Sequence, residues 1–243
     1  MKAPFPGRCA QMGARMRRTG TKILTVRGIY AIMKRMREEM PMNIETLVLG
    51  PLQTNCYILN FEKEALLVDP AADAELILKK LHEKEWSLKG ILLTHTHFDH
   101  MGAVDAIVKA TGAPLYCPYK DAPGLRDWGK NLSLHFTRHT MQVDTVPAVL
   151  LHEWDTVPFG NERLRVLETP GHTVGSVCYE GEDFLFSGDT LFYHGYGRTD
   201  IPGGSEEQLS QSLSRLLTLE NRTVYPGYGQ PTSLEDERIF FGF

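Results

Sequence analysis

Long apolar runs are missing from this chain of 243 residues. Its apolar stretches, of which Ile91-Leu92-Leu93 is an example, have the length of a strand, whereas a helix that crosses a bilayer needs about 20 apolar residues. We therefore expect no membrane-spanning segment and no membrane partner. The length and the hydrophobic fraction of 42% suit one sizeable globular domain and do not require a second.

Closely spaced cysteines are missing as well. The four cysteines, Cys9, Cys56, Cys117 and Cys178, are scattered along the chain. This spacing favours free thiols, mostly buried as small hydrophobic side chains, over a disulfide framework. Free thiols fit a reducing compartment, so the pattern predicts a cytoplasmic protein.

Acidic residues are scarce in the first 41 residues, which hold ten basic and two acidic side chains, a net charge of +8. Residues 42–243 hold 16 basic and 28 acidic side chains, a net charge of −12, so this part offers no electrostatic attraction to nucleic acid. The Arg17-Arg18 pair would suit an export signal, but Arg27 and Gly28 interrupt the apolar stretch that follows. A mitochondrial presequence is a second interpretation. We favour a third, in which Met42 is the natural start and residues 1–41 come from an over-extended reading frame. Under each interpretation we expect residues 1–41 to be a disordered extension, with at most a helix near residues 29–39.

From residue 42 onward, strands and helices occur in two blocks, which predicts one layered α/β domain over residues 42–243. Hydrophobic patterning predicts strands at residues 43–49, 54–60, 65–68, 90–93, 115–117, 164–167, 176–179, 184–186 and 223–225. It predicts helices at residues 74–84, 104–109 and 206–217, and a last helix after Ser233. Asp73 and Ser233 are the expected N-caps. Four prolines make residues 118–160 less regular.

A cluster of metal-ligand side chains follows the strand expected at residues 90–93. Thr94-His95-Thr96-His97-Phe98-Asp99-His100 places three imidazoles and a carboxylate within six consecutive residues. In extended backbone, His95 and His97 point the same way because side chains alternate. Zinc, iron and manganese accept these ligand types, so the motif predicts a metal site better than a histidine-rich surface loop. The other histidines are isolated and predicted to be surface or core residues: His82, His135, His139, His152 and His194.

Two later segments place further ligand types at strand ends. His172 lies in Thr169-Pro170-Gly171-His172-Thr173, and Asp189 lies in Ser187-Gly188-Asp189-Thr190. Glycine turns allow close backbone approach at such positions. We therefore expect both side chains to complete the cluster.

These motifs, together with residues 50–57 (Gly-Pro-Leu-Gln-Thr-Asn-Cys-Tyr), Asp69-Pro70 and residues 197–204, resemble the metallo-β-lactamase superfamily. Within it they are similar to the glyoxalase II-like, or hydroxyacylglutathione hydrolase-like, branch over about residues 43–240. The resemblance implies an α/β fold, the four-layer αββα sandwich with metals at the sheet edge. It implies that His95, His97 and His172 bind a first ion, that Asp99 and His100 bind a second, and that Asp189 bridges them. Zinc is expected, one or two ions per chain, with iron or manganese as alternatives.

The chain departs from that family pattern at Tyr228. The family usually has Pro-Gly-His-Gly where this chain reads Pro226-Gly227-Tyr228-Gly229. A phenol has a pKa near 10 and is a poor neutral ligand, so the second ion is expected to bind more weakly, or the site to work with one metal. Ligation by a phenolate, or a hydrogen bond from Tyr228 to a water or a substrate oxygen, both stay open.

The leading functional hypothesis is hydrolysis of a small-molecule thioester such as an acyl-glutathione. Metal-activated water would attack the carbonyl carbon near Asp99, the expected catalytic residue, and Asp189. The chain stops soon after Thr232, without the helical extension that glyoxalase II enzymes usually carry for glutathione. Residues 118–160 offer another pocket wall, with these candidates: Arg126, Trp128, Lys130, Phe136 and Trp154.

Two alternatives remain. The resemblance also extends to persulfide dioxygenases, which implies one iron held by His95, His172 and Asp189. A degenerate metal-binding protein without catalysis is the other alternative. Among other branches, a lactamase is disfavoured by the lack of an export signal and a nuclease by the acidic body.

Overall fold

The computed structural model describes residues 42–137 and 139–243, and the predictions for residues 1–41 and Cys9 lie outside them. The described residues form two six-stranded sheets. In spatial order, the first sheet contains β1 (Asn43–Leu49), β2 (Thr54–Phe61), β3 (Glu64–Val68), β4 (Ser87–Leu92), β5 (Leu115–Pro118) and β6 (Val149–Leu151). The second contains β14 (Thr232–Ser233), β13 (Thr223–Pro226), β10 (Phe184–Gly188), β9 (Val177–Glu180), β8 (Glu162–Glu168) and β7 (Thr156–Phe159).

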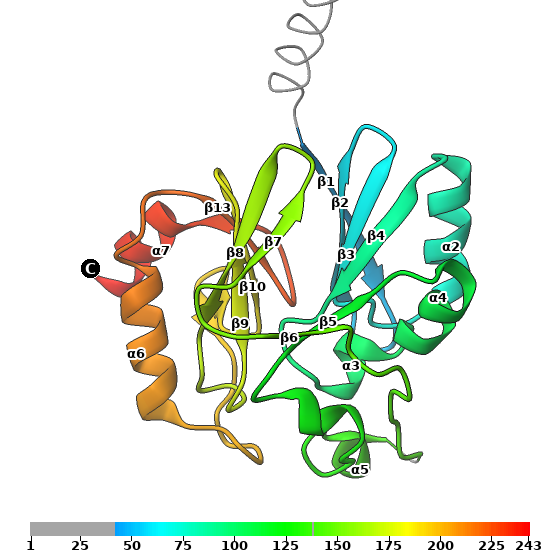
Figure 1. Ribbon diagram of the computed structural model, residues 1–243. Helices are drawn as coiled ribbons and strands as arrows, with labels where there is room; N and C mark the ends of the chain where they lie inside the picture. Colours follow the sequence, from blue (N-terminus) through cyan, green and yellow to red (C-terminus); the bar gives the residue numbers. More distant parts are fainter. Residues whose placement is uncertain (1–41, 138) are drawn as a thin grey trace, which may run out of the picture. The chain divides into compact units, whose positions relative to one another are not determined.

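Helices cover the outer face of each sheet, so the layers run helix, sheet, sheet, helix (Figure 1). The first sheet is covered by α2 (Ala74–Glu83) and α4 (Val104–Thr111), and the second by α6 (Glu206–Leu216) and α7 (Leu234–Phe241). Shorter elements are α3 (Phe98–Met101), the 3₁₀ helix η1 (Ala122–Leu125), α5 (Ser133–Phe136) and a hairpin of β11 (Leu191–Phe192) and β12 (Gly195–Tyr196). The predicted four-layer αββα sandwich is confirmed. In the described part of the chain, no helix is long and apolar enough to span a membrane.

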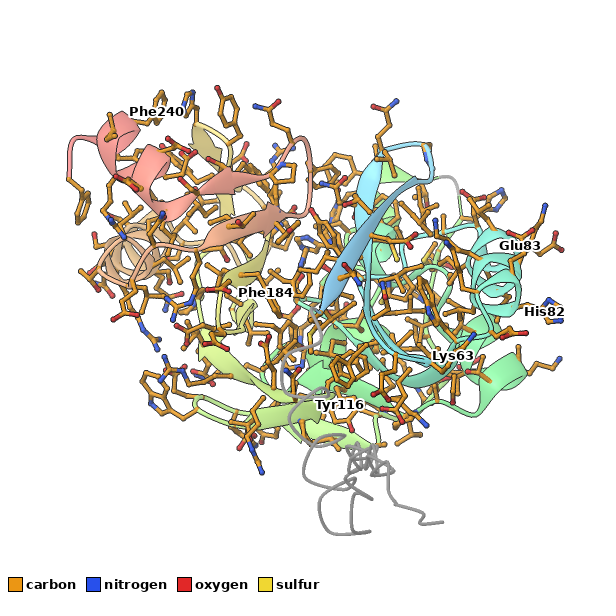
Figure 2. All side chains as sticks on the ribbon, turned by 90° about the horizontal axis from the view of Figure 1, so that it is seen from above. Lys63, His82, Glu83, Tyr116, Phe184 and Phe240 are labelled. Carbon is orange, nitrogen blue, oxygen red and sulfur yellow. The ribbon has the colours of Figure 1, made fainter. Side chains whose placement is uncertain are left out.

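Side-chain alternation along buried strands explains why the two sheets stack. Cys56 and Ile58 of β2 pack into the core beneath α2 and α4, whereas Tyr57 and Leu59 pack into the core between the sheets. A strand buried on both faces belongs inside a layered fold. Figure 2 shows the space between the sheets filled with side chains, with Phe184 lying among them. A third core joins the second sheet to α6 and α7.

Most predicted elements are confirmed to within a few residues, and Ser233 is confirmed as an N-cap because its Oγ accepts a hydrogen bond from the Asp236 amide at 3.0 Å. Asp73 is confirmed as the residue at the N-cap position of α2, but its backbone is left-handed and its side chain makes no capping hydrogen bond. Its carboxylate instead accepts a 3.4 Å hydrogen bond from the Gly50 amide, which holds the β1–β2 turn.

Residues 118–160 contain more regular structure than the prolines predicted, including β6, β7 and α5. Pro118 ends β5, and Pro158 lies in β7 at the edge of the second sheet, where a missing amide donor is tolerated. The three described cysteines are confirmed as buried free thiols, and burial raises the pKa of each.

Candidate metal centre

Strand direction brings the predicted ligands to one edge of the sandwich. Strands β3 and β4 run parallel, and Asp69 and the motif of residues 94–100 follow their carboxyl ends. Strands β8 and β10 are both antiparallel to β9 and therefore run the same way, and β13 is parallel to β10. His172, Asp189 and Tyr228 follow these three strands. All the predicted site residues thus come from the carboxyl ends of strands.

Three imidazoles meet at this edge. The Nδ1 atom of His97 lies 3.0 Å from the Nε2 atom of His95 and 3.0 Å from the Nε2 atom of His172. All three side chains are buried, and their ligand atoms lie within 4.8 Å of one another. The pairing expected of His95 and His97 from strand alternation holds, although α3 begins directly after His97.

The hydrogen-bond pattern leaves lone pairs at the centre of this group. The Thr94 hydroxyl donates to Asp69 at 2.6 Å, so its oxygen accepts the 3.0 Å hydrogen bond from His95 Nδ1–H. His172 Nδ1–H donates to the Arg198 carbonyl at 2.8 Å. The Nε2 atoms of His95 and His172 therefore carry lone pairs that face His97, which has at most one ring proton between them. A cation would satisfy all three nitrogens.

The protonation state of His95 and His97 also suits a cation. Burial lowers the pKa of His95 and His97 well below its usual range, and neighbouring imidazoles lower it further. Neutral imidazole is the form that ligates metals. The Nε2 atom of His97 is buried without a hydrogen-bond partner among the described residues.

A second group of donors lies beside the first. His100 Nε2 is 3.4 Å from Asp189 Oδ1 and 3.8 Å from Asp99 Oδ2, and His172 Nε2 is 3.4 Å from Asp189 Oδ2. Burial alone would lower the pKa of His100, but three neighbouring carboxylates outweigh it and raise the pKa well above the usual value. Burial alone would raise the pKa of Asp189, but the imidazoles, His100 foremost, lower it. Asp189 thus offers one oxygen to each group, the arrangement expected of a bridging ligand.

Tyr228 points its hydroxyl at Asp99. The phenol donates a short hydrogen bond to Asp99 Oδ2, and the Thr54 hydroxyl donates to the same oxygen at 3.3 Å. Burial raises the pKa of Tyr228, and the negative charges of Asp189 and Asp99 raise it further. The partner of the phenol is therefore a carboxylate, where the sequence suggested a water or a substrate oxygen.

Asp69 orients the cluster in a way that sequence reasoning missed. Its buried carboxylate accepts hydrogen bonds from the Thr94 amide at 2.8 Å, the Thr94 hydroxyl at 2.6 Å and His100 Nδ1 at 2.9 Å. Asp69 also lies near ring nitrogens of His95 and His100, but these hydrogen bonds engage both of its oxygens, so we assign it an orienting role. The available signal was an aspartate directly after a buried strand and before a proline.

Asp121, also missed, joins two of the ligand loops. Its carboxylate accepts from the Thr96 amide at 2.7 Å and from the Gly175 amide at 3.2 Å. The loop that carries His95 and His97 is thereby held against the loop that carries His172. The five isolated histidines are exposed as predicted and lie outside the cluster.

Gly227 sits directly behind the second group of donors. A Cβ atom there would overlap Asp189 Oδ1 and lie 3.0 Å from His100 Cε1. We predict that Gly227→Ala displaces both side chains and lowers metal affinity about tenfold to 100-fold, the range seen when ligand orientation is lost. Metal retention against a competing chelator measures this. Gly195→Ala is the matched control, because its Cβ would meet nothing nearer than the Tyr193 carbonyl at 4.0 Å. Equal retention in the two variants would contradict the prediction.

The cluster opens into a cavity of about 510 Å³. His97, Asp99, His172, Asp189 and Tyr228 lie on its wall. Most of the remaining lining is apolar or aromatic: Leu52, Phe98, Leu132, Phe136, Phe192, Tyr196 and Ile201. Arg198 supplies the cation. Of the pocket candidates in residues 118–160, Phe136 lines this cavity, and Arg126, Trp128, Lys130 and Trp154 do not.

Two stacked sheets between helices, with a histidine and aspartate cluster at one edge, define a metal-binding αββα protein. Residues 49–228 match the metallo-beta-lactamase superfamily, and the chain belongs to this superfamily of metallo-hydrolases. Among curated relatives, the probable metallo-hydrolase YqgX of Bacillus subtilis is 38% identical over 194 residues, covering 78% of this chain and 91% of the relative. Hydroxyacylglutathione hydrolase GloC of Haemophilus influenzae is 29% identical over 214 residues, covering 81% of this chain and 95% of the relative.

Solved structures agree on the fold and differ in the activity or metal they name. BLEG-1 B3 metallo-beta-lactamase superposes with a TM-score of 0.77 at 37% identity, over 81% of this chain and 97% of that protein. TTHA1623 in a di-iron-bound form superposes with a TM-score of 0.69 at 34% identity, over 79% of this chain and 96% of that protein. ETHE1 from Myxococcus xanthus superposes with a TM-score of 0.66 at 30% identity, over 81% of this chain and 82% of that protein. Because one neighbour holds two irons, the fold alone does not identify the metal.

Proposed function

We propose that this protein is a metal-dependent thioester hydrolase. The observation that carries the proposal is the convergence of the His95, His97 and His172 lone pairs beside Asp99 on the wall of an open cavity. The buried Nε2 atom of His100, which has no hydrogen-bond partner among the described residues, supports a cation beside Asp99 and Asp189. We assign His95, His97, His172 and Asp189 to one ion and Asp99, His100 and Asp189 to a second, with zinc as the expected metal.

When bound, a divalent cation lowers the pKa of a water toward 7 and polarises the substrate carbonyl. Asp99 lies on the cavity wall, where its carboxylate accepts the proton of the attacking water. The hydroxyls of Tyr228 and Thr54 engage Oδ2 of Asp99, so Oδ1 is the oxygen assigned to this proton. The Arg198 carbonyl accepts a hydrogen bond from His172 Nδ1 and so fixes the ring. The Nε2 lone pair of His172 therefore stays directed at the space that it shares with His95 and His97.

Hydrolysis forms a bond between the water oxygen and the acyl carbon and breaks the bond between that carbon and sulfur. The products are a carboxylic acid and a thiol. A thiolate leaves readily, so this reaction does not need a strong general acid, and among the described residues the cavity wall holds no lysine, glutamate or cysteine. The similarity to GloC supports the same substrate class.

The test is a substrate panel with the zinc-loaded protein. Thiol release from an acyl-glutathione supports the proposal. The panel includes a chromogenic lactam, because the chain is similar to BLEG-1, and a phosphodiester. Cleavage confined to either of these two substrates would overturn the proposal.

A second candidate is persulfide dioxygenation, favoured by the likeness to ETHE1. His95, His172 and Asp189 would hold one iron, the triad set out from the sequence. Oxygen uptake that depends on a persulfide and iron, together with no thioester cleavage, would select this candidate.

Arg198 is expected to contact an anionic group of the substrate. Its side chain is 54% exposed at the cavity, pairs with Asp200 at 2.7 Å and lies 5.9 Å from the Phe136 ring centre. We predict that Arg198→Ala raises KM for acyl-glutathione by roughly 3–10-fold with little change in kcat. An exposed charge contact stabilises the bound substrate and the transition state by the same free energy, so its loss weakens binding without slowing the bound complex. Arg163→Ala, an exposed arginine outside this cavity, is the control. An unchanged KM for Arg198→Ala would contradict the assignment.

A further inference from the structure

The second group of donors is less complete than the first, and the difference is at Tyr228. The first group offers three imidazole nitrogens and one oxygen of Asp189. The second offers His100 Nε2 and Asp189 Oδ1, both buried without a hydrogen-bond partner among the described residues, and one carboxylate, Asp99. The next side chain around this space is the phenol of Tyr228, whose ring centre lies 5.7 Å from that of His100.

The backbone around Tyr228 is held firmly against the second group. The Gly227 amide donates to the Gly188 carbonyl at 2.7 Å, and the Asn55 amide group donates to the carbonyls of Pro226 and Gly229 at 3.0 and 2.9 Å. The Tyr57 hydroxyl donates to the Pro226 carbonyl at 2.6 Å. The place of the phenol is therefore set by a fixed turn rather than by a free loop.

The Tyr228 hydroxyl donates its hydrogen bond to Asp99. Both Tyr228 and Thr54 donate to Asp99 Oδ2, and the two hydroxyl oxygens lie 3.5 Å apart. These bonds take up one oxygen of the carboxylate and hold the phenol as a donor. With its hydroxyl engaged by Asp99, the phenol is a poorer ligand for zinc than the imidazole and carboxylate groups beside it, so the second space keeps three protein ligands.

We propose that this chain binds one metal ion tightly among His95, His97 and His172 and a second ion weakly and exchangeably beside Asp99, because Tyr228 is a hydrogen-bond donor to Asp99 and not a ligand. The inference rests on the proposed metal site and does not depend on the substrate. It departs from TTHA1623, the similar protein that was solved in a di-iron-bound form.

The experiment compares the full chain with two variants at the same position. Wild type, Tyr228→His and Tyr228→Phe are loaded with zinc, dialysed against a moderate chelator and analysed for bound metal by mass spectrometry. We expect about one ion per chain in wild type, about two in Tyr228→His, which gains an imidazole ligand, and about one in Tyr228→Phe. Circular dichroism melting confirms that each variant is folded. A wild-type sample loaded with ferric iron should show no phenolate-to-iron absorption band in the visible range.

The outcomes separate this inference from the proposed function. Two retained ions in wild type, or a visible phenolate band, would show Tyr228 to be a ligand and overturn the inference. One ion in Tyr228→His would also overturn it, because Tyr228 would then not set the stoichiometry. No retained ion in folded wild type would overturn both the inference and the metal site. The expected stoichiometries without thioester cleavage would support the inference and count against the substrate class alone.

Discussion

Replacing His95 by alanine is expected to lower kcat/KM for thioester hydrolysis by at least about 1,000-fold, or about 4 kcal/mol of transition-state stabilisation. His95 contributes the lone pair that faces His97, and the Thr94 hydroxyl fixes its tautomer. Its loss leaves the first group with two imidazoles, so metal retention should fall in parallel. Activity is measured by thiol release and metal by mass spectrometry on the same samples.

The fold should survive this substitution, since the centre is held by the surrounding sheets rather than by His95 alone. His82→Ala is the matched control: His82 lies on the outer side of α2 and points away from the sheets (Figure 2), and it should keep full activity and metal. A folded His95→Ala protein with unchanged thioester hydrolysis would eliminate the proposed mechanism. Loss of activity with metal fully retained would remove His95 from the ligand set.

Replacing Asp69 by alanine is expected to have the largest effect on stability. The change leaves the Thr94 amide, the Thr94 hydroxyl and His100 Nδ1 without their acceptor inside the protein. Leaving buried donors unpaired costs about 1–3 kcal/mol per group, and these neighbours do not add independently. We expect a loss of about 2–4 kcal/mol in the free energy of unfolding, measured by denaturant titration.

Metal affinity should also fall in Asp69→Ala, by about tenfold to 100-fold, because the tautomers of His95 and His100 both depend on this carboxylate. Asp127→Ala is the control, since Asp127 is exposed, accepts from the amides of Gly129 and Lys130, and forms a surface ion pair with the Lys130 ammonium group at 3.9 Å. A fall in affinity without loss of stability would limit Asp69 to ligand orientation. If neither the stability nor the metal affinity falls, the hydrogen bonds around Thr94 are not maintained in solution.

The six proposed ligands were predictable because each lies in a short segment with its own signal. His95, His97, Asp99 and His100 share one motif, and His172 and Asp189 follow strands whose apolar runs are clear. Strand direction then brings the segments together, a consequence of sheet topology. The layer order was likewise predictable from the resemblance, and the structure confirms it.

Asp69 and Asp121 could not be assigned from sequence because their roles depend on tertiary contacts. Asp69 reaches His100 across 31 positions of the chain, and Asp121 reaches Gly175 across 54. Local patterning gave the N-cap position of Asp73 but not the partner of its carboxylate, which is the Gly50 amide. Tyr228 was visible as a departure in the sequence, but its partner, Asp99, was visible only in the structure.

Metal dependence of thioester cleavage tests the central claim most directly. The purified chain is stripped with a strong chelator, assayed with acyl-glutathione, and assayed again after titration with zinc. The account predicts no detectable thiol release from the stripped protein and recovery that reaches its plateau when the site formed by His95, His97 and His172 is filled. Thiol release that is unaffected by stripping, or no release at any zinc loading of the folded protein, would contradict it.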